Sequence, residues 1–301
     1  MNASPPRHVY GVIAAAVLAI SAAGVLVRGA DGAAPVTLAL YRSLGVAILF
    51  SPFLARPSRS DMARLLLAGA ALALHFVVWF ESLNHTTILR STVLVTFTPA
   101  WVGVMEWLFL KRRPALRFWP GVVIGALGTA AMVSDTGDAT LYGDALAVLG
   151  GIFAAVYMVV GRSVRARLGI GPYGAAVCIV SAACLLPVAA VTHAPMWGFS
   201  TTTWLCIAGL VLGPQLIGHN GLNYALRWFP AATISALTLL EPLGATALAM
   251  VVLGEHPTGW TLFGAAISLV GVTLAVSPLP AFQWRKRSLP PVAVNVDEDS
   301  R

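Results

Sequence analysis

The chain has 301 residues, of which 58% are hydrophobic and 10% are charged, and its mean hydropathy is +0.81. This composition excludes an ordinary soluble domain, in which about 25% of the residues are charged. The net charge of +7 does not indicate a nucleic-acid partner, because the basic residues are distributed as in membrane proteins. The apolar runs are long and do not alternate with polar residues, so they predict spanning helices rather than barrel strands.

Ten apolar segments are long enough to cross a bilayer as helices, which requires roughly 20 residues each. In chain order they are residues 9–27, 35–54, 62–81, 87–110, 116–134, 141–161, 173–191, 203–222, 231–253 and 260–277. The fold class is therefore predicted to be an all-α integral membrane protein with no separate soluble domain. Residues 281–301 hold a Pro-Pro pair and an acidic cluster, and we expect them to form a disordered cytoplasmic tail.

The basic residues predict the orientation of the spans. If the N-terminus is cytoplasmic, every Lys and Arg except Arg28, Arg42 and Arg90 falls in or beside an inner segment. Acidic residues such as Asp144 and Glu255 instead lie in or beside the proposed outer loops. We therefore expect both the N-terminus and the C-terminus to be cytoplasmic, in agreement with an even number of spans.

A repeat divides the chain into two halves. Six residues within 94–128 recur within 237–271 at a constant offset of 143, including two prolines and two glycines. We assign the first repeat to residues 1–138 and the second to residues 139–280, with five spans each. Because five is odd, the second repeat must enter the membrane from the opposite side. Inverted repeats are typical of transporters, whose substrate site lies near the bilayer midplane between the repeats.

Three charged residues are candidates for a role in ion coupling or in binding a charged group. Arg42, in the second span, is either an anchor that is ion-paired or reaches the interface, or a contact for an anion such as a carboxylate. Glu81, at the outer end of the third span, is a candidate partner for Arg42. Glu241, in the ninth span, is protonated, paired with Arg227 or another donor, or part of ion coupling, and these alternatives stay open.

Two prolines interrupt spans at equivalent positions of the repeat. Pro99 in the fourth span and Pro242 in the ninth each remove a backbone donor, so both helices are expected to bend. We predict that these two bends are hinges around a cavity, and the alternative is that they only shape the packing of the bundle.

Polar and aromatic side chains at membrane depth are candidates for binding a substrate. His75 and Trp79 are one helical turn apart, and Gln215 belongs to a polar row with spacing of four residues in the eighth span. The predicted substrate-binding residues are His75, Trp79, Trp101, Tyr157, His219 and Asn223. The alternatives are an interhelical hydrogen-bond network for the polar row and core packing for Trp101.

The sequence holds no motif of a common enzyme class. It lacks the G-x-S-x-G motif of serine hydrolases and the P-loop of ATPases, so no enzymatic activity is expected. Asp135 and Asp138 have the D-x-x-D spacing of a magnesium site in a lipid-modifying transferase, but a solvated outer loop accounts for them. The three cysteines form no C-x-x-C motif, and no metal or other cofactor is expected.

Several short motifs resemble those of a known family. They are Leu-Glu-Pro-Leu at 240–243, Leu-Gly-Glu at 253–255, the glycines at 264 and 271, and Pro35 with Arg42 downstream. With these motifs, nearly the whole chain resembles the EamA-type transporters of the drug/metabolite transporter superfamily. The first repeat departs from the pattern, because Thr98 and Arg112 stand where the second has glutamates.

The resemblance implies ten helices related by a pseudo-two-fold axis around a central cavity. It also implies a secondary transporter that exports amino acids or similar small metabolites across the bacterial inner membrane by alternating access. The expected partners are a small-molecule substrate and the lipid bilayer, without nucleic acid, and a monomer is compatible with the sequence. The alternatives are a drug or nucleotide-metabolite transporter of the same fold, a membrane-embedded lipid-modifying enzyme and a scaffold without transport.

Overall fold

The computed structural model describes residues 5–86, 88–111, 113–132, 140–253 and 258–276. All regular elements in these ranges are helices, which confirms the predicted all-α fold class. Several residues discussed above lie outside these ranges: Arg112, Asp135, Asp138, Glu255 and the tail at 281–301.

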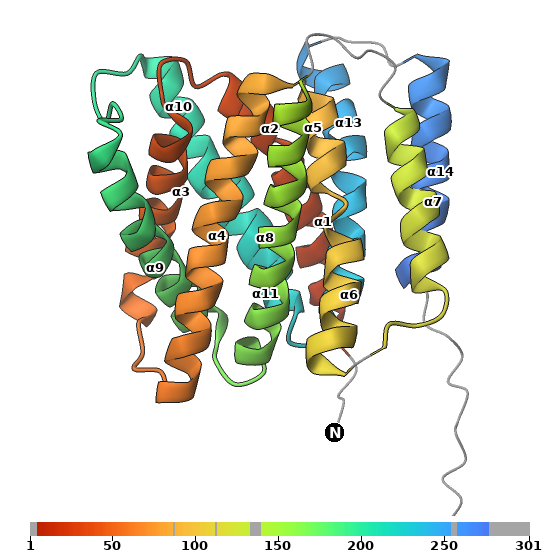
Figure 1. Cartoon of the computed structure of the whole chain (residues 1–301), viewed down its shortest axis with the longest axis horizontal. Helices are drawn as coiled ribbons and strands as arrows, with labels where there is room; N and C mark the ends of the chain where they lie inside the picture. The colour runs from red at the N-terminus through yellow and green to blue at the C-terminus, as the bar shows by residue number, and fades with distance from the viewer. Residues whose placement is uncertain (1–4, 87, 112, 133–139, 254–257, 277–301) are drawn as a thin grey trace, which may run out of the picture.

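The helices form one bundle (Figure 1). In chain order they are α1 Arg7–Ser21, α2 Ala23–Arg28, α3 Pro35–Phe50, η1 Ser51–Phe53, α4 Arg59–His85, α5 Ile88–Val95, α6 Thr98–Leu110, α7 Phe118–Ala131, α8 Leu141–Arg165, α9 Ile170–Val191, α10 Thr201–Leu210, η2 Val211–His219, α11 Asn220–Ala225, α12 Ala231–Ala236, η3 Leu237–Leu240, α13 Glu241–Leu253 and α14 Gly259–Val276. Within the described ranges, nine helical segments are long and apolar enough to cross a membrane, and α7 is a shorter apolar helix. Every predicted span therefore contains helix.

The third span extends further than its apolar core suggests. The sequence predicts residues 62–81, whereas α4 runs from Arg59 to His85. Ser58 caps its first turn, because the Ser58 side chain accepts a hydrogen bond from the backbone nitrogen of Asp61 at 3.2 Å. Polar residues at both ends of α4 thus continue the helix beyond the apolar stretch.

Two spans are interrupted at the prolines of the repeat. In the fourth, α5 ends at Val95 and α6 begins at Thr98, directly before Pro99. In the ninth, the 3-10 segment η3 precedes α13, in which Pro242 is the second residue. Proline cannot donate a backbone hydrogen bond, so the preceding turn loses part of its ladder. The Thr98 hydroxyl donates to the Val95 carbonyl at 2.7 Å and satisfies one acceptor at the break.

The eighth span was predicted to be a continuous helix, but the structure contains a π-helical segment there. η2 joins α10 to α11 and carries Pro214 in its interior. A π-helical turn adds a residue to each turn, so it shifts the direction of the side chains that follow. It is also common at functional sites, and η2 contributes directly to the cavity described below.

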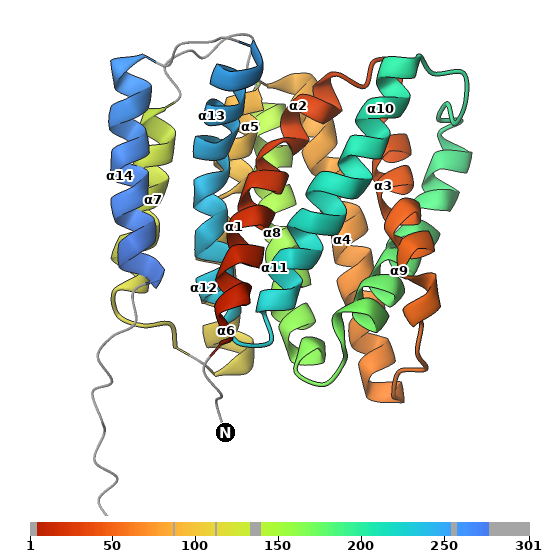
Figure 2. The same ribbon diagram turned by 180° about the vertical axis from the view of Figure 1, so that it is seen from behind.

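Two glycine positions occur in both copies of the repeat, and these glycines lie where α7 and α14 contact each other. The two helices run side by side in both ribbon views (Figures 1 and 2). A Cβ atom on Gly271 would lie 2.1 Å from the backbone nitrogen of Gly125, and one on Gly128 would lie 2.3 Å from that of Ser268. Small residues let helix backbones approach closely in membranes. The glycines of the repeat therefore form a tight helix-helix contact.

The first and last described helices have their outer ends on the same side of the bundle. In Figure 1, α1 begins and α14 ends towards the lower side. This arrangement is expected for an even number of crossings. The side that faces the cytoplasm stays a prediction from the basic residues.

Candidate functional site

A central cavity lies among the helices of both halves. Five of the six predicted substrate-binding residues line it, namely His75, Trp79, Tyr157, His219 and Asn223. The charged residues Arg42 and Glu241 line the same cavity.

Arg42 enters the cavity from α3 and is fully buried, with 0% exposure. Its Nε donates to the Oε1 atom of Gln215 at 2.8 Å, and its guanidinium carbon lies 4.1 Å from the centre of the Phe76 ring. The two terminal nitrogens, Nη1 and Nη2, are buried and have no hydrogen-bond partner among the described residues. Within the described ranges Arg42 also has no salt bridge, so it is neither an interfacial anchor nor an ion-paired one.

The position of Gln215 follows from the π-helical segment η2. Gln215 comes directly after Pro214 and is 1% exposed. Its amide nitrogen donates to the Cys178 sulfur at 3.6 Å, while its amide oxygen accepts the Arg42 hydrogen bond. Both ends of the amide are therefore engaged, and its orientation is set by α3 and α9 together.

His75 and Trp79 form one wall of the cavity. Their rings are parallel within 7°, with centroids 5.9 Å apart, as expected for residues one turn apart on α4. Because a carbonyl can only accept, His75 Nδ1 donates to the Gly150 oxygen at 2.9 Å. Its Nε2 then has no partner among the described residues. The Trp79 Nε1 donor is also buried, and no described residue accepts a hydrogen bond from it.

Tyr157, His219 and Asn223 also line the cavity. The Asn223 side-chain amide donates to the Tyr157 hydroxyl, which joins α11 to α8. The His219 ring lies 5.8 Å from the His75 ring and 5.4 Å from the Phe76 ring, measured between centroids. The predicted polar row therefore faces the bundle interior. Within this row, Gln215 and Asn223 form hydrogen bonds to side chains of other helices, and His219 lines the cavity.

The chain is similar in sequence to a known protein family. The profile of the EamA-like transporter family matches residues 9–134 and again residues 141–277. The chain belongs to this family. A solved crystal structure shares its fold, with a TM-score of 0.73 and 19% identity over 89% of this chain and 97% of that one.

Two relatives of this EamA protein have informative names. The threonine/homoserine exporter RhtA of Salmonella typhimurium is 32% identical, over 75% of this chain and 76% of its own length. A probable terminal-alkyne amino-acid exporter of Streptantibioticus cattleyicolor is 27% identical, over 89% of this chain and 93% of its own length. Together with the apolar helices, the family membership makes this protein a multi-pass membrane transporter and not an enzyme.

Two pairings that the sequence left open are not formed between the described residues. Glu81 does not pair with Arg42, because it lies at the end of α4 and its Oε1 is 3.0 Å from His85 Nε2. Arg227 does not pair with Glu241 in the described part of the chain, since it is exposed at the bundle end, 5.8 Å from the Trp228 ring centre. Glu81 was a candidate on depth alone, and depth does not determine the direction of a side chain.

Trp101 differs from the other predicted substrate-binding residues. It is half-buried in α6 and packs against the hydrophobic core, and it is not among the described lining residues of the cavity. Its Nε1 donor is buried without a partner. Pro99 and Pro242 do not line the cavity either, but their neighbours Thr98 and Glu241 do.

The structure contains one buried polar cluster that the sequence analysis did not predict. Glu106 of α6 is 3% exposed, and its Oε1 accepts from Arg162 Nη1 at 3.0 Å and from the Ala231 backbone nitrogen at 3.2 Å. This carboxylate joins α6, α8 and the first turn of α12, where a negative charge is favourable. The available signal was a glutamate inside an apolar span, which is costly unless it is paired.

Proposed function

We propose that this EamA protein is a secondary transporter that exports amino acids or similar small metabolites across the bacterial inner membrane by alternating access. The single observation that carries the proposal is the pair of unpartnered Arg42 nitrogens in the central cavity. A buried guanidinium without a partner costs several kcal/mol. A transported carboxylate would supply that partner and would remove much of this cost.

The geometry of Arg42 favours a carboxylate over other acceptors. Since Gln215 occupies Nε, the two terminal nitrogens present parallel donors to one ligand. An arginine fork of this kind matches the two oxygens of a carboxylate. The names of the two relatives, both amino-acid exporters, support the same substrate class.

Alternating access requires helices that change shape near the cavity. The breaks before Pro99 and Pro242 lie beside two lining residues, Thr98 and Glu241. In this proposal the two prolines are hinges in equivalent helices of two inverted repeats. Rocking around them would open the cavity to one side of the membrane and close it to the other.

The test is counterflow of labelled amino acids in proteoliposomes that are loaded with unlabelled candidates. We expect uptake that depends on the protein and that a subset of amino acids blocks. Arg42→Lys should weaken this uptake roughly tenfold to hundredfold, because lysine keeps the charge but loses the bidentate fork.

Arg227→Lys is the matched control, since Arg227 is exposed at the bundle end, and its uptake should equal that of the unsubstituted protein. The proposal is wrong if no amino acid exchanges, or if Arg42→Lys transports as well as the control.

A further inference from the structure

The central cavity holds two ionisable side chains of opposite sign that form no direct salt bridge. Arg42 and Glu241 both line it and attract each other electrostatically, yet no salt bridge within 4.0 Å joins them in the described part of the chain. The Glu241 side chain, from the first turn of α13, also accepts no hydrogen bond from any described residue. A guanidinium and a carboxyl group therefore face one space, and neither the terminal nitrogens of Arg42 nor the carboxyl of Glu241 has a hydrogen-bond partner among the described residues.

The threonine hydroxyl groups in the lining do not offer protons to a ligand. Thr98 donates to the Val95 and Gly151 carbonyls, and Thr238 donates to the Ser235 carbonyl at 2.7 Å. Thr96 likewise donates to the Val93 carbonyl at 3.1 Å. Each hydroxyl proton is thus used within the helices, so these threonines contribute mainly their methyl groups to the cavity surface.

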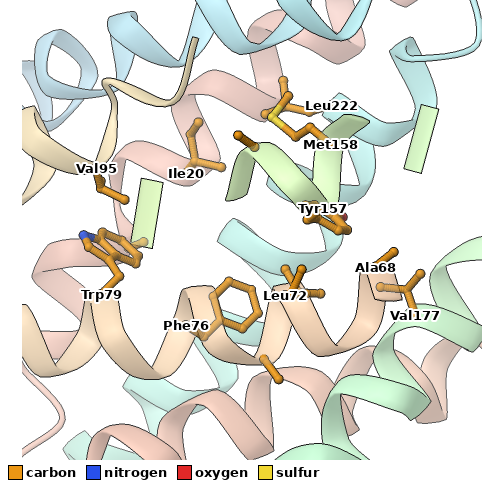
Figure 3. Packing of buried hydrophobic residues seen from close by; sticks show 14 of the residues in the cluster. Ile20, Ala68, Leu72, Phe76, Trp79, Val95, Tyr157, Met158, Val177 and Leu222 are labelled. Carbon is orange, nitrogen blue, oxygen red and sulfur yellow. The ribbon is translucent and has the colours of Figure 1, made fainter. Parts of the chain in front are cut away.

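Apart from the polar residues His75, Tyr157, His219 and Asn223, part of the lining is apolar. Ile20, Val95, Trp79, Met158 and Leu222 are the side chains concerned, and they come from α1, α5, α4, α8 and α11. Figure 3 shows Ile20, Val95, Trp79, Met158 and Leu222 among the buried side chains of the bundle. An apolar group in this space would be surrounded by alkyl and aromatic surface.

We propose that the cavity binds a zwitterionic amino acid with an apolar side chain. Arg42 receives the carboxylate, Glu241 receives the ammonium, and the wall around Ile20 and Met158 receives the side chain. This inference rests on the proposed function, because it names the substrate class of the same cavity. It gives Glu241 a specificity role, which separates amino acids from simple carboxylic acids.

Charge pairing predicts which analogues are rejected. A carboxylic acid without an ammonium leaves Glu241 unpaired, and an amine without a carboxylate leaves Arg42 unpaired. Sites that are built to pair with a polar group discriminate strongly against analogues that lack it. Discrimination at the apolar wall is weaker, because an apolar pocket rejects an added hydroxyl by about a hundredfold at most.

The experiment measures dissociation constants on the purified full-length protein in detergent, where membrane permeation of the ligands has no effect. The probes are valine, its isostere threonine, 3-methylbutanoate without the ammonium, and 2-methylpropylamine without the carboxylate. We expect valine to bind at least tenfold more tightly than each of the other three compounds.

Two variants test the role of Glu241. Glu241→Gln should weaken valine binding at least tenfold while it leaves 3-methylbutanoate binding unchanged, so the preference for valine disappears. Glu81→Gln makes the same chemical change outside the cavity and should retain the preference of the unsubstituted protein.

Three outcomes would overturn the inference: absence of valine binding, equal binding of valine and 3-methylbutanoate, or a preference that survives Glu241→Gln. If threonine binds as tightly as valine, the assignment of the apolar wall is wrong. Counterflow of other amino acids in proteoliposomes would still support the proposed export in all four cases. Failure of the inference is therefore separable from failure of the proposed function.

Discussion

At the scale of single residues, Gln215 determines how Arg42 meets a ligand. It is neutral, so it fixes Nε without cancelling the charge that a substrate carboxylate would need. Gln215→Glu would place a carboxylate within reach of Arg42 and would form a permanent ion pair. We expect substrate affinity to fall at least tenfold, because the substrate must then compete with an internal anion. Counterflow at increasing substrate concentration measures this change.

Protein yield and melting temperature separate this effect from misfolding. An internal ion pair in the cavity should keep the melting temperature at or above that of the unsubstituted protein, since it gives Arg42 a partner. Gln215→Asn keeps a neutral amide and serves as the matched variant, with a smaller loss of affinity. Unchanged affinity in Gln215→Glu would contradict the assignment of Arg42 to the substrate.

The contacts of single residues are the features that the sequence predicts least well. The depth of Arg42 could be predicted from its span, but its partner lies 173 residues away, on another helix. The π-helical segment around Pro214 changes the side-chain directions there, and a regular period of 3.6 residues does not anticipate that change. Most of the cavity residues could therefore be predicted from their depth in the membrane. Their contacts could not, because these depend on the rotation of each helix about its axis.

At the scale of elements, the contact between α7 and α14 should not tolerate a side chain at Gly271. Its Cβ position lies 2.1 Å from the Gly125 backbone nitrogen, so Gly271→Ala must push the helices apart. Overpacking of this kind typically costs about 1–3 kcal/mol. We expect a lower melting temperature in detergent and a lower yield of folded protein.

Gly259→Ala is the control on the same helix, because a Cβ there meets nothing within 4 Å. Its melting temperature should match that of the unsubstituted protein. Equal melting temperatures for both variants would show that α7 and α14 are further apart than described.

Helix breaks were predictable to the extent that proline causes them. The breaks near Pro99 and Pro242 follow from a missing backbone donor, which is a local property of the chain. The capped start of α4 at Ser58 is also local, but it lies outside the apolar run that defined the span. Hydropathy thus locates a spanning helix but underestimates its length where polar caps extend it.

At the scale of the whole molecule, the bilayer makes the fold class predictable. A chain without polar partners in hydrocarbon must form helices or a closed barrel, and the long apolar runs select helices. The arrangement of the helices in the bundle is harder to predict from the sequence. The contact of α7 with α14 depends on glycines of both halves, such as Gly128 and Gly271. The repeat revealed that these positions are equivalent, but not that they touch.

The orientation of the whole molecule is the remaining prediction, and single cysteines test it. The loop before α4 carries Arg56 and Arg59 and is predicted to be cytoplasmic, whereas Trp197, which lies between α9 and α10 and is 76% exposed, is predicted to be outside. A membrane-impermeant maleimide should label Trp197→Cys in intact cells and Arg56→Cys only after lysis. The unsubstituted chain measures labelling of its own cysteines. The reverse pattern would place both termini outside, so the basic residues would not set the topology.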